Sequence, residues 1–362
     1  EEIGLEKVNN TEVTKKALFN PKGNDSIQNR RITGGDTTNL FNLNDTKYGW
    51  AKNMYRVMMG NFWVPEKVDL SNDLRDYKKL TKHELRAFKG TISFLVFLDS
   101  LQTNNVPNIA DYITAPEVST LLAIQTYQEA IHSQSYAYIL ESIVPANERV
   151  KIYDFWREDK ILLERNNHIA NIFQNFIDNP NDDTFARVLV ANYILEGLYF
   201  YNGFNFFYNL ASRHLMMGVA DEIRYINRDE LTHVTIFKNI ILALKDEKPG
   251  LITQELVHEM FGEAVTQEIE WSQHILDNHI LGINDQSSEK YTKFLANMRM
   301  KMLGFDELYP GFDVNPYAHL EKLADENNDG VKSNFFESTV TNYSQSSSAV
   351  SYTHLRAHET RH

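Results

Sequence analysis

The 362-residue chain contains no cysteine. This absence excludes disulfides, thiolate nucleophiles and cysteine-ligated zinc or iron–sulfur sites, and it predicts a cytoplasmic location. No uninterrupted apolar run reaches the roughly 18 residues that a membrane-spanning helix needs, and no signal peptide opens the sequence. Positive charge is also in deficit, because 36 Lys and Arg stand against 49 Asp and Glu, a net charge of -13. We therefore expect neither a membrane nor a nucleic acid as partner, since a nucleic acid usually binds a basic face.

Strand-like alternation of apolar and polar residues is nearly absent after residue 81, where long segments have helical periodicity instead. Short polar breaks separate these segments. One helix start is marked by Pro116 and Glu117, with Thr114 as the expected cap. The pattern predicts an all-α bundle with helices at about 82–104, 116–143, 147–177, 184–212, 216–245, 252–278 and 284–303.

Two carboxylates stand alone in predicted helices that are apolar nearly all round. Asp99 is the only formal charge between Lys89 and Asp111, and Glu196 is the only one in 188–212. Helices of this kind lie in the middle of a bundle. Because burying an unpaired ion costs several kcal/mol or more, each of these carboxylates needs a partner.

Two Glu-x-x-His pairs, Glu129/His132 and Glu230/His233, each place a carboxylate and an imidazole on one helix face. The spacing alone is weak, because 49 acidic residues and 12 histidines in 362 positions give about 1.6 acidic-x-x-His pairs by chance. Two more pairs lie in polar surroundings and are interpreted as surface pairs: Glu255/His258 and Glu359/His362.

The lone carboxylates and the pairs form one pattern, in which each half of the chain supplies a carboxylate on one helix and Glu-x-x-His on the next. This is the ligand arrangement of ferritin-like di-iron and di-manganese bundles, with the shorter Asp99 in place of one Glu. Four carboxylates offset two divalent cations, and ligands without thiolate suit Fe or Mn better than structural zinc. The alternative is that arginine or backbone groups satisfy each acid separately. It would have to explain four acids and two histidines in this pattern by chance. We therefore predict a ferritin-like helical bundle with a buried di-metal carboxylate site whose ligands are Asp99, Glu129, His132, Glu196, Glu230 and His233.

Four motifs, in order and spacing, resemble the small (beta) subunit of class I ribonucleotide reductase of the tyrosyl-radical type. They are Phe62-Trp63-x-Pro65-Glu66, Leu98-Asp99-Ser-x-Gln102, Glu129-x-Ile-His132-Ser-x-Ser-Tyr136 and Arg228-Asp229-Glu230-x-x-His233. The resemblance covers about residues 45–345. It implies two metal ions per chain, Fe first and Mn as the alternative, and a homodimer. It also implies a ribonucleoside-diphosphate reductase that supplies deoxyribonucleotides for DNA replication, in which this subunit passes a radical to the large (alpha) subunit.

The same resemblance assigns roles to individual residues. Tyr136, one turn beyond His132, would hold the stable radical that forms when the reduced metal centre meets O2. With 18 tyrosines in the chain, its position alone leaves a chance neighbour open. The apolar radical cage would be Phe200, Phe204 and Ile226, for which ordinary core packing is the alternative. The radical-transfer residues would be Trp63, Asp229, Glu337 and Tyr343.

Two other functions could use the same ligands. A di-metal oxidase or desaturase would need a substrate pocket at the centre, and it would need neither Trp63 nor Tyr343. A ferritin-like iron store would favour a much shorter chain that assembles into a cage, without the C-terminal tail. The motifs favour the radical-generating subunit.

The chain is expected to divide into four parts. Residues 1–45, rich in Asn, Asp, Gly and Thr, predict an irregular arm. The helical di-metal domain would span 46–320, and a flexible tail would span 321–348. Chains that it resembles end in an acidic or aromatic tail that docks on the large subunit, whereas residues 349–362 are basic and rich in histidine. We interpret 349–362 as a non-native extension.

Overall fold

Long helices make up most of the fold, as the periodicity predicts. The computed structural model describes residues 13–326, and within that range it contains no β-strand. Its α-helices are α1 (Gly49–Gly60), α2 (Ser71–Tyr77), α3 (Lys82–Ala110), α4 (Pro116–Ile143), α5 (Ala146–Glu158), α6 (Lys160–Asp178), α7 (Asp182–Ile194), α8 (Tyr201–Ser212), α9 (Met217–Glu247), α10 (Gln254–Leu276), α11 (Asp285–Met302) and α12 (Ala318–Glu326). Short helical turns are η1 (Ile27–Asn29), η2 (Pro65–Lys67) and the π turn η3 (Leu195–Tyr199).

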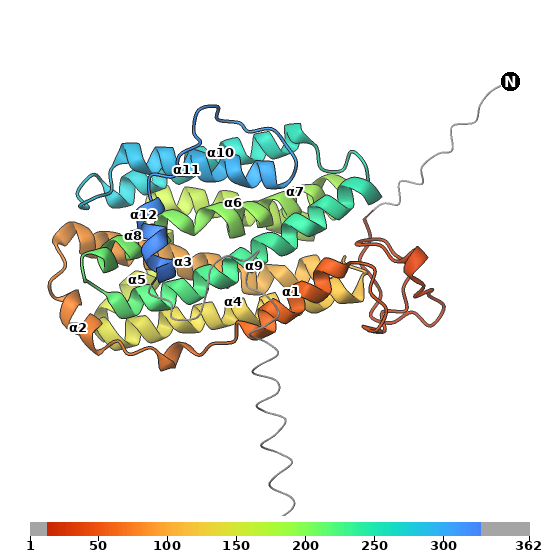
Figure 1. Cartoon of the computed structure of the whole chain (residues 1–362), viewed down its shortest axis with the longest axis horizontal. Coiled ribbons are helices and arrows are strands. Elements are labelled where there is room, and N and C mark those ends of the chain that lie inside the picture. The colour runs from red at the N-terminus through yellow and green to blue at the C-terminus, as the bar shows by residue number, and fades with distance from the viewer. Residues whose placement is uncertain (1–12, 327–362) are drawn as a thin grey trace, which may run out of the picture.

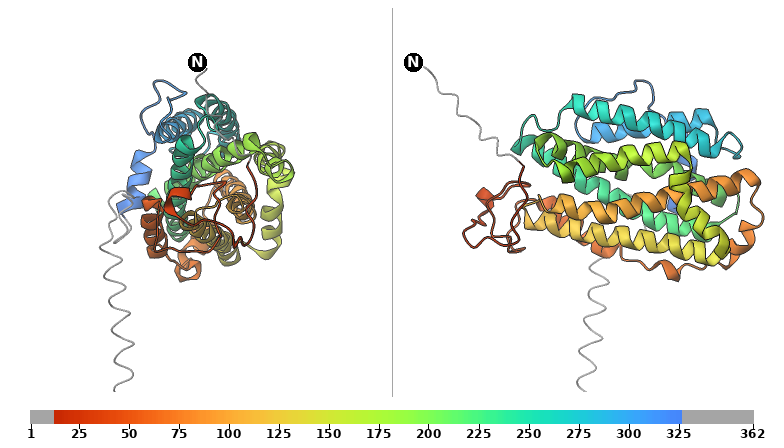
Figure 2. Two further views of the ribbon diagram at one scale, coloured as in Figure 1. Left: turned by 90° about the vertical axis from the view of Figure 1, so that its right-hand side faces the viewer. Right: turned by 180° about the vertical axis from the view of Figure 1, so that it is seen from behind.

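The helices run roughly along one axis and surround a buried interior (Figure 1). Helix α3 packs on α4, and α9 packs on α1, α4 and α7. The α10–α11 hairpin covers one side of this bundle, and the irregular segment before α1 lies at one end of it, as the views from the end and from behind also show (Figure 2). In the described part of the chain, no helix is long and apolar enough to cross a membrane.

The predicted helix 147–177 is two helices in the structure. The side chain of Asp159 accepts a hydrogen bond from the backbone N–H of Leu162 at 3.0 Å, and so it caps α6 just after α5 ends. Helix α3 starts with a reciprocal capping box between Thr81 and Glu84 and continues past residue 104 through Pro107. The helix α12 crosses residue 320, the expected domain boundary.

The expectation that Thr114 caps a helix is wrong. Its hydroxyl donates to the backbone carbonyl of Arg31 at 2.8 Å, and Ala115 occupies the cap position of α4 without a side-chain hydrogen bond. Arg30 also donates to the carboxylate of Glu117 at 3.1 Å, and both of these side chains are buried. Thr114 and Glu117, the residues that suggested a helix start, therefore bind the N-terminal segment to the bundle.

A π turn interrupts the predicted helix 184–212 and separates α7 from α8. The turn contains Glu196, and the carbonyl of Gly197 accepts a hydrogen bond from Arg299 of α11 at 2.9 Å. A side chain at position 197 would place its Cβ only 3.1 Å from Arg299 Nε, so glycine allows the close approach of this guanidinium. Single π turns inside helices occur frequently at functional sites.

Candidate metal centre

Six side chains from the middle of the bundle meet in its buried interior. They come from α3, α4, η3 and α9, and they are Asp99, Glu129, His132, Glu196, Glu230 and His233. All are fully buried, with 0% of their surface exposed. The structure thus brings together every residue that the sequence analysis proposes as a ligand.

The six side chains form two overlapping groups, in each of which one nitrogen or oxygen atom per residue lies within 4.8 Å of the others. The first group is Asp99, Glu129, His132 and Glu230, and the second is Glu129, Glu196, Glu230 and His233. Glu129 and Glu230 belong to both groups. Their carboxylates can therefore bridge two ions.

The imidazole of His132 points Nδ1 toward the carboxylates of the centre. Nδ1 lies 3.0 Å from Glu230 Oε1 and 3.4 Å from Asp99 Oδ1. On the other side of the ring, Nε2 lies 2.9 Å from Asp229 Oδ2. Nε2 donates to Asp229, so Nδ1 is the ring nitrogen that faces the centre and would be the ligand atom for a bound cation.

The imidazole of His233 is oriented in the same way, but by an amide. Its Nδ1 lies 3.1 Å from Glu129 Oε1 and 3.2 Å from Glu230 Oε2. Its Nε2 lies 2.7 Å from Gln128 Oε1, which accepts the hydrogen bond. Both rings are thus oriented with Nδ1 toward the centre, as a metal ligand there requires.

Glu196 receives its hydrogen bonds from amides. Gln125 Nε2 donates to Glu196 Oε1 at 2.9 Å, and Gln102 Nε2 donates to the same oxygen. Gln102 is in turn bonded to Asn192 at 2.8 Å. These amides fix one oxygen of Glu196, and the other oxygen has no hydrogen-bond partner.

The charges of the protein alone do not balance in this centre. Burial, followed by the repulsion of Glu196, raises the pKa of Glu129 to about 8. Burial by itself would lower the pKa of His132, but the carboxylates of Asp229 and Asp99 outweigh it and raise that pKa well above its ordinary value. Both pKa shifts arise because too little positive charge lies among these buried carboxylates.

The unsatisfied oxygens test whether a metal fits. Both oxygens of Glu129 and one oxygen each of Asp99, Glu196 and Glu230 are buried without a hydrogen-bond partner. Such atoms are costly unless a cation or a donor satisfies them. Oxygen donors with one imidazole per group suit Fe or Mn. The residues present therefore fit a buried di-metal carboxylate–histidine site.

Tyr136 lies on α4 one turn beyond His132 and has no exposed surface. Its hydroxyl forms no hydrogen bond. Burial, and then the nearby carboxylate of Asp99, raises the pKa of the phenol well above its usual range. Of the proposed cage residues, Phe200 and Phe204 are stacked at 5.6 Å between ring centroids, and they are buried, as is Ile226.

Trp63 is connected to the centre by hydrogen bonds. Its Nε1 donates to Asp229 Oδ2 at 2.9 Å, and the same oxygen accepts from His132 Nε2 at 2.9 Å. The structure thus places two of the proposed radical-transfer residues in one chain of contacts. Glu337 and Tyr343, the other two, lie outside the described residues, as does the pair Glu359/His362.

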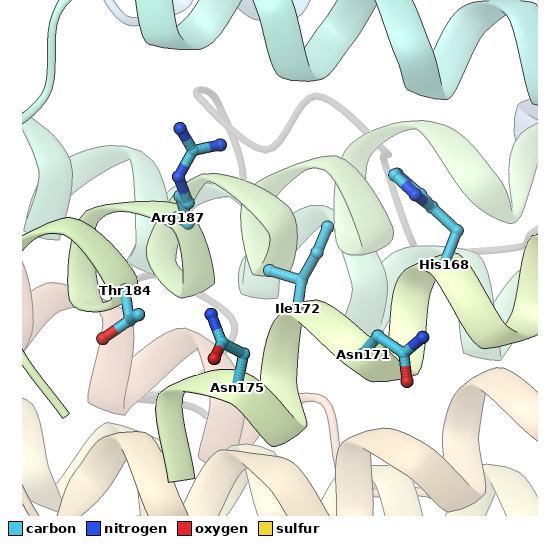
Figure 3. Close-up of a pocket in the computed structure, with 6 residues that line it drawn as sticks. All are labelled: His168, Asn171, Ile172, Asn175, Thr184 and Arg187. Carbon is cyan, nitrogen blue, oxygen red and sulfur yellow. The ribbon is translucent and has the colours of Figure 1, made fainter. Parts of the chain in front are cut away.

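The pair Glu255/His258 lies on the surface, where His258 Nε2 bonds the backbone carbonyl of Asp306 at 2.8 Å. A shallow hollow of about 330 Å³ opens between α6 and α7 (Figure 3). Its lining residues are His168, Asn171, Ile172, Asn175, Thr184 and Arg187. None of these is part of the buried centre.

Sequence reasoning missed the amides that support the centre. Gln125 and Gln128 lie on the same helix as Glu129, and both are buried, but a neutral side chain carries no charge that marks it in an apolar segment. Gln125 lies four residues and Gln128 one residue before Glu129. These positions could have identified them, because a polar residue in a central helix needs a partner. Gln102 lies in the Leu98–Gln102 motif, but the sequence assigned it no role.

Comparison with known proteins adds an independent line of support. A family model described as ribonucleotide reductase, small chain, matches residues 40–316. The chain is 43% identical over 343 residues to the ribonucleoside-diphosphate reductase subunit beta of Treponema pallidum (strain Nichols), covering 94% of this chain and 98% of that protein. The corresponding subunit of Halalkalibacterium halodurans is 38% identical over 317 residues, covering 87% and 91%.

A solved structure has the same fold. The ribonucleotide reductase R2 subunit from Clostridium botulinum is 46% identical, with a TM-score of 0.84, and the match covers 86% of this chain and 99% of that chain. The predicted class, an all-α ferritin-like bundle with a buried di-metal carboxylate site, is confirmed.

Proposed function

Because this chain belongs to the ribonucleotide reductase small-chain family, we propose that its buried centre places an oxidising equivalent on Tyr136. The small subunits of this family generate a radical for the large subunit, which reduces ribonucleotides to deoxyribonucleotides. The chain is accordingly the beta component of a ribonucleoside-diphosphate reductase. The observation that carries the Tyr136 proposal is a fully buried phenol, without a hydrogen bond, one turn from a histidine of the centre.

The two residue groups would each hold one metal ion, with Glu129 and Glu230 shared. We propose Fe as the physiological metal and Mn as the alternative, activated by an oxidant derived from O2. When bound, such a pair supplies one-electron oxidising power. Support comes from the donor set of carboxylates and imidazoles, which contains no thiolate because the chain has no cysteine.

The protein groups around Tyr136 decide what happens to the phenol. Because its pKa is raised by burial and by the carboxylate of Asp99, the phenol keeps its proton until an electron leaves. Complete burial keeps water and reductants away from the oxidised ring. We propose that the apolar side chains of Phe200, Phe204 and Ile226 contribute to this exclusion.

Trp63 and Asp229 would form the inner part of the transfer route. The indole N–H and His132 Nε2–H share Asp229 Oδ2, so this carboxylate fixes the distance between the indole and the centre. Glu337 and Tyr343 are proposed to continue the route, on the strength of the motif resemblance alone.

Reconstitution tests the assignment of Tyr136. The full chain is loaded with Fe(II), or with Mn(II), treated with an oxidant, and followed by electron paramagnetic resonance. We expect a tyrosyl signal in the wild type and no tyrosyl signal in Tyr136→Phe, with about two metal ions per chain in both. Survival of the signal in Tyr136→Phe would rule out this residue as the radical site.

We further propose that the subunit is a cytoplasmic homodimer. The absence of cysteine from the sequence fits a reducing compartment. Analytical ultracentrifugation over a range of concentrations measures the oligomeric state directly, and a single species with the mass of one chain would contradict the proposal.

A further inference from the structure

Trp63 contacts a second oxidisable ring, Tyr225, which is not part of the metal centre. Its indole stacks on Tyr225, with ring centroids 5.0 Å apart and an angle of 14° between the ring planes. The His132 ring is farther away, at 6.4 Å and 35°. Of the ring contacts in residues 13–326, these are the two that involve Trp63, so the indole contacts both a ring of the centre and Tyr225.

Helix α9 creates this arrangement. Tyr225 and Asp229 are four residues apart on α9, so both side chains project from one face of the helix. Asp229 receives the indole N–H, and Tyr225 lies on the indole face. One helix face therefore holds both groups that determine the position of Trp63.

Exposure increases along this series of contacts. Asp229 and His132 are fully buried, Trp63 is 8% exposed, and Tyr225 is partly exposed. The neighbouring side chain of Phe62 is 69% exposed, so the Trp63 segment lies at the surface of the subunit.

A cation holds the outer ring in place. The guanidinium of Arg228 lies over the Tyr225 ring at 5.1 Å from its centroid and also donates to the carbonyl of Asn61 at 2.6 Å. The segment that carries Trp63 and the helix that carries Tyr225 are thereby joined. The stacked pair is thus fixed on both sides of the contact.

We propose that Tyr225 is a redox relay, the residue to which the oxidising equivalent moves from Trp63 at the surface of the subunit. This inference rests on the proposed function, because the metal centre and Tyr136 supply the oxidising equivalent. In the step, one electron moves from Tyr225 to the one-electron-oxidised indole of Trp63. The indole keeps its N–H bond to Asp229, the phenolic proton of Tyr225 passes to water, and the products are Trp63 and a neutral Tyr225 phenoxyl radical.

The contact can carry this step because stacked rings exchange an electron through overlapping π orbitals without breaking a bond. A packing role alone needs a ring and no hydroxyl. Tyr225→Phe therefore separates the two roles, since it keeps the stack and removes the proton whose loss gives a neutral radical. Tyr138→Phe is the matched control, because Tyr138 is also partly buried but its hydroxyl bonds the carbonyl of Val68 at 2.6 Å.

The absence of cysteine gives a direct test that needs neither metal nor Tyr136. Phe62→Cys provides a single thiol beside Trp63 for attachment of a ruthenium photo-oxidant to the full chain. After a laser flash, we expect an indolyl absorption that converts into a phenoxyl absorption. Adding Tyr225→Phe should abolish the phenoxyl signal and lengthen the indolyl lifetime by about tenfold or more, while adding Tyr138→Phe should change neither. Adding Trp63→Phe should suppress the phenoxyl signal.

A phenoxyl signal that is unchanged in Tyr225→Phe, or unchanged in Trp63→Phe, would overturn the proposal. The reconstituted holoenzyme with its large subunit provides a second readout. There Tyr225→Phe should keep the Tyr136 radical yield and lower turnover by about tenfold or more, and wild-type turnover would count against the relay. If the wild type forms no Tyr136 radical, the proposed function fails, but the flash experiment still decides the role of Tyr225.

Discussion

The two histidines of the centre differ in the group that lies behind each ring. His132 donates to the carboxylate of Asp229, and His233 donates to the amide oxygen of Gln128. A carboxylate makes an imidazole a stronger electron donor than a neutral amide does. The two metal positions therefore differ in donor strength, although both use the same ligand types.

Gln128→Leu tests the contribution of the amide. The substitution keeps the volume but leaves His233 Nε2–H without its acceptor, so the ring is free to rotate away from the centre. We expect metal affinity to fall by about 10–100-fold at one of the two positions, measured by Mn(II) titration with paramagnetic resonance detection. Gln134→Leu, an exposed change on the same helix, is the control and should leave both affinities unchanged. Equal affinities in Gln128→Leu and the wild type would contradict this role.

A buried carboxyl group outside the centre predicts a pH dependence of stability. Glu222 of α9 has no exposed surface, and neither of its oxygens has a hydrogen-bond partner. Burial, and then the carboxylates of Glu66 and Asp221, raises its pKa from 4.5 to about 9. The folded chain therefore retains a proton that the unfolded chain releases. The contribution of Glu222 to the free energy of unfolding is therefore complete below about pH 4.5 and is lost as the pH rises toward about 9.

Glu222→Gln removes this dependence, because the amide is neutral at every pH. We expect the variant to melt several degrees higher than the wild type at pH 8 and at nearly the same temperature at pH 5, measured by circular dichroism. Glu255→Gln, an exposed change on α10, should not alter the difference between the two pH values. A wild-type pH profile in Glu222→Gln would show that Glu222 is ionised in the folded chain.

Charged residues of the centre could be identified from the sequence, whereas neutral residues that support it could not. Asp99 and Glu196 were identifiable because each is the only formal charge in an apolar helix, and the cost of burying an ion implies a partner. Gln128 and Tyr225 carry no charge, and their partners are far away in the sequence. Only the packed structure shows that the amide bonds His233 and that the phenol stacks on Trp63.

At the scale of elements, the π turn η3 positions a ligand. A wider turn leaves a carbonyl outside the regular helical pattern, and here the carbonyl of Gly197 is satisfied by Arg299 of α11. Glu196 precedes Gly197 directly, so this hydrogen bond also fixes the orientation of a ligand of the centre. The π turn has no sequence signature of its own, which is why periodicity predicted one uninterrupted helix.

Arg299→Leu should therefore weaken both the fold and the centre. It leaves a buried carbonyl unsatisfied, which costs about 1–3 kcal/mol, and it releases the turn that holds Glu196. We expect a lower free energy of unfolding in urea and a metal affinity reduced by about tenfold. Arg157→Leu is the control, since that side chain is 60% exposed on α5. Loss of stability with unchanged metal affinity would separate the π turn from the ligand geometry.

The starts of α3 and α4 were predicted correctly, whereas the break between α5 and α6, which Asp159 caps locally, was missed. The capping box of Thr81 and Glu84 starts α3 at the expected place. Thr114 has the chemistry of a cap, but its hydroxyl bonds Arg31 of the N-terminal segment instead. Local rules describe what a side chain can do, and tertiary contacts decide which partner it takes.

On the scale of the whole molecule, the bundle encloses a set of like charges that its own residues do not neutralise. Helices far apart in sequence each contribute to the centre, and their apolar faces pack around it. The ferritin-like class was predictable from this pattern because only a bundle brings four such helices together. Because enclosing these charges is costly, cations held at this centre would contribute to the stability of the folded chain.

Removal of metal should consequently destabilise the entire subunit. A ligand that binds only the folded state stabilises it by about 2.7 kcal/mol at one hundred times its dissociation constant, and in this centre the cations also relieve repulsion between buried carboxylates. We expect the melting temperature to fall on chelation and to recover on addition of Fe(II) or Mn(II). Glu129→Gln should shrink this difference, because it removes a shared ligand and also one of the repelling charges. Tyr136→Phe should keep the full difference, and a wild-type chain that melts at the same temperature with and without chelator would contradict the proposed cation-dependent core.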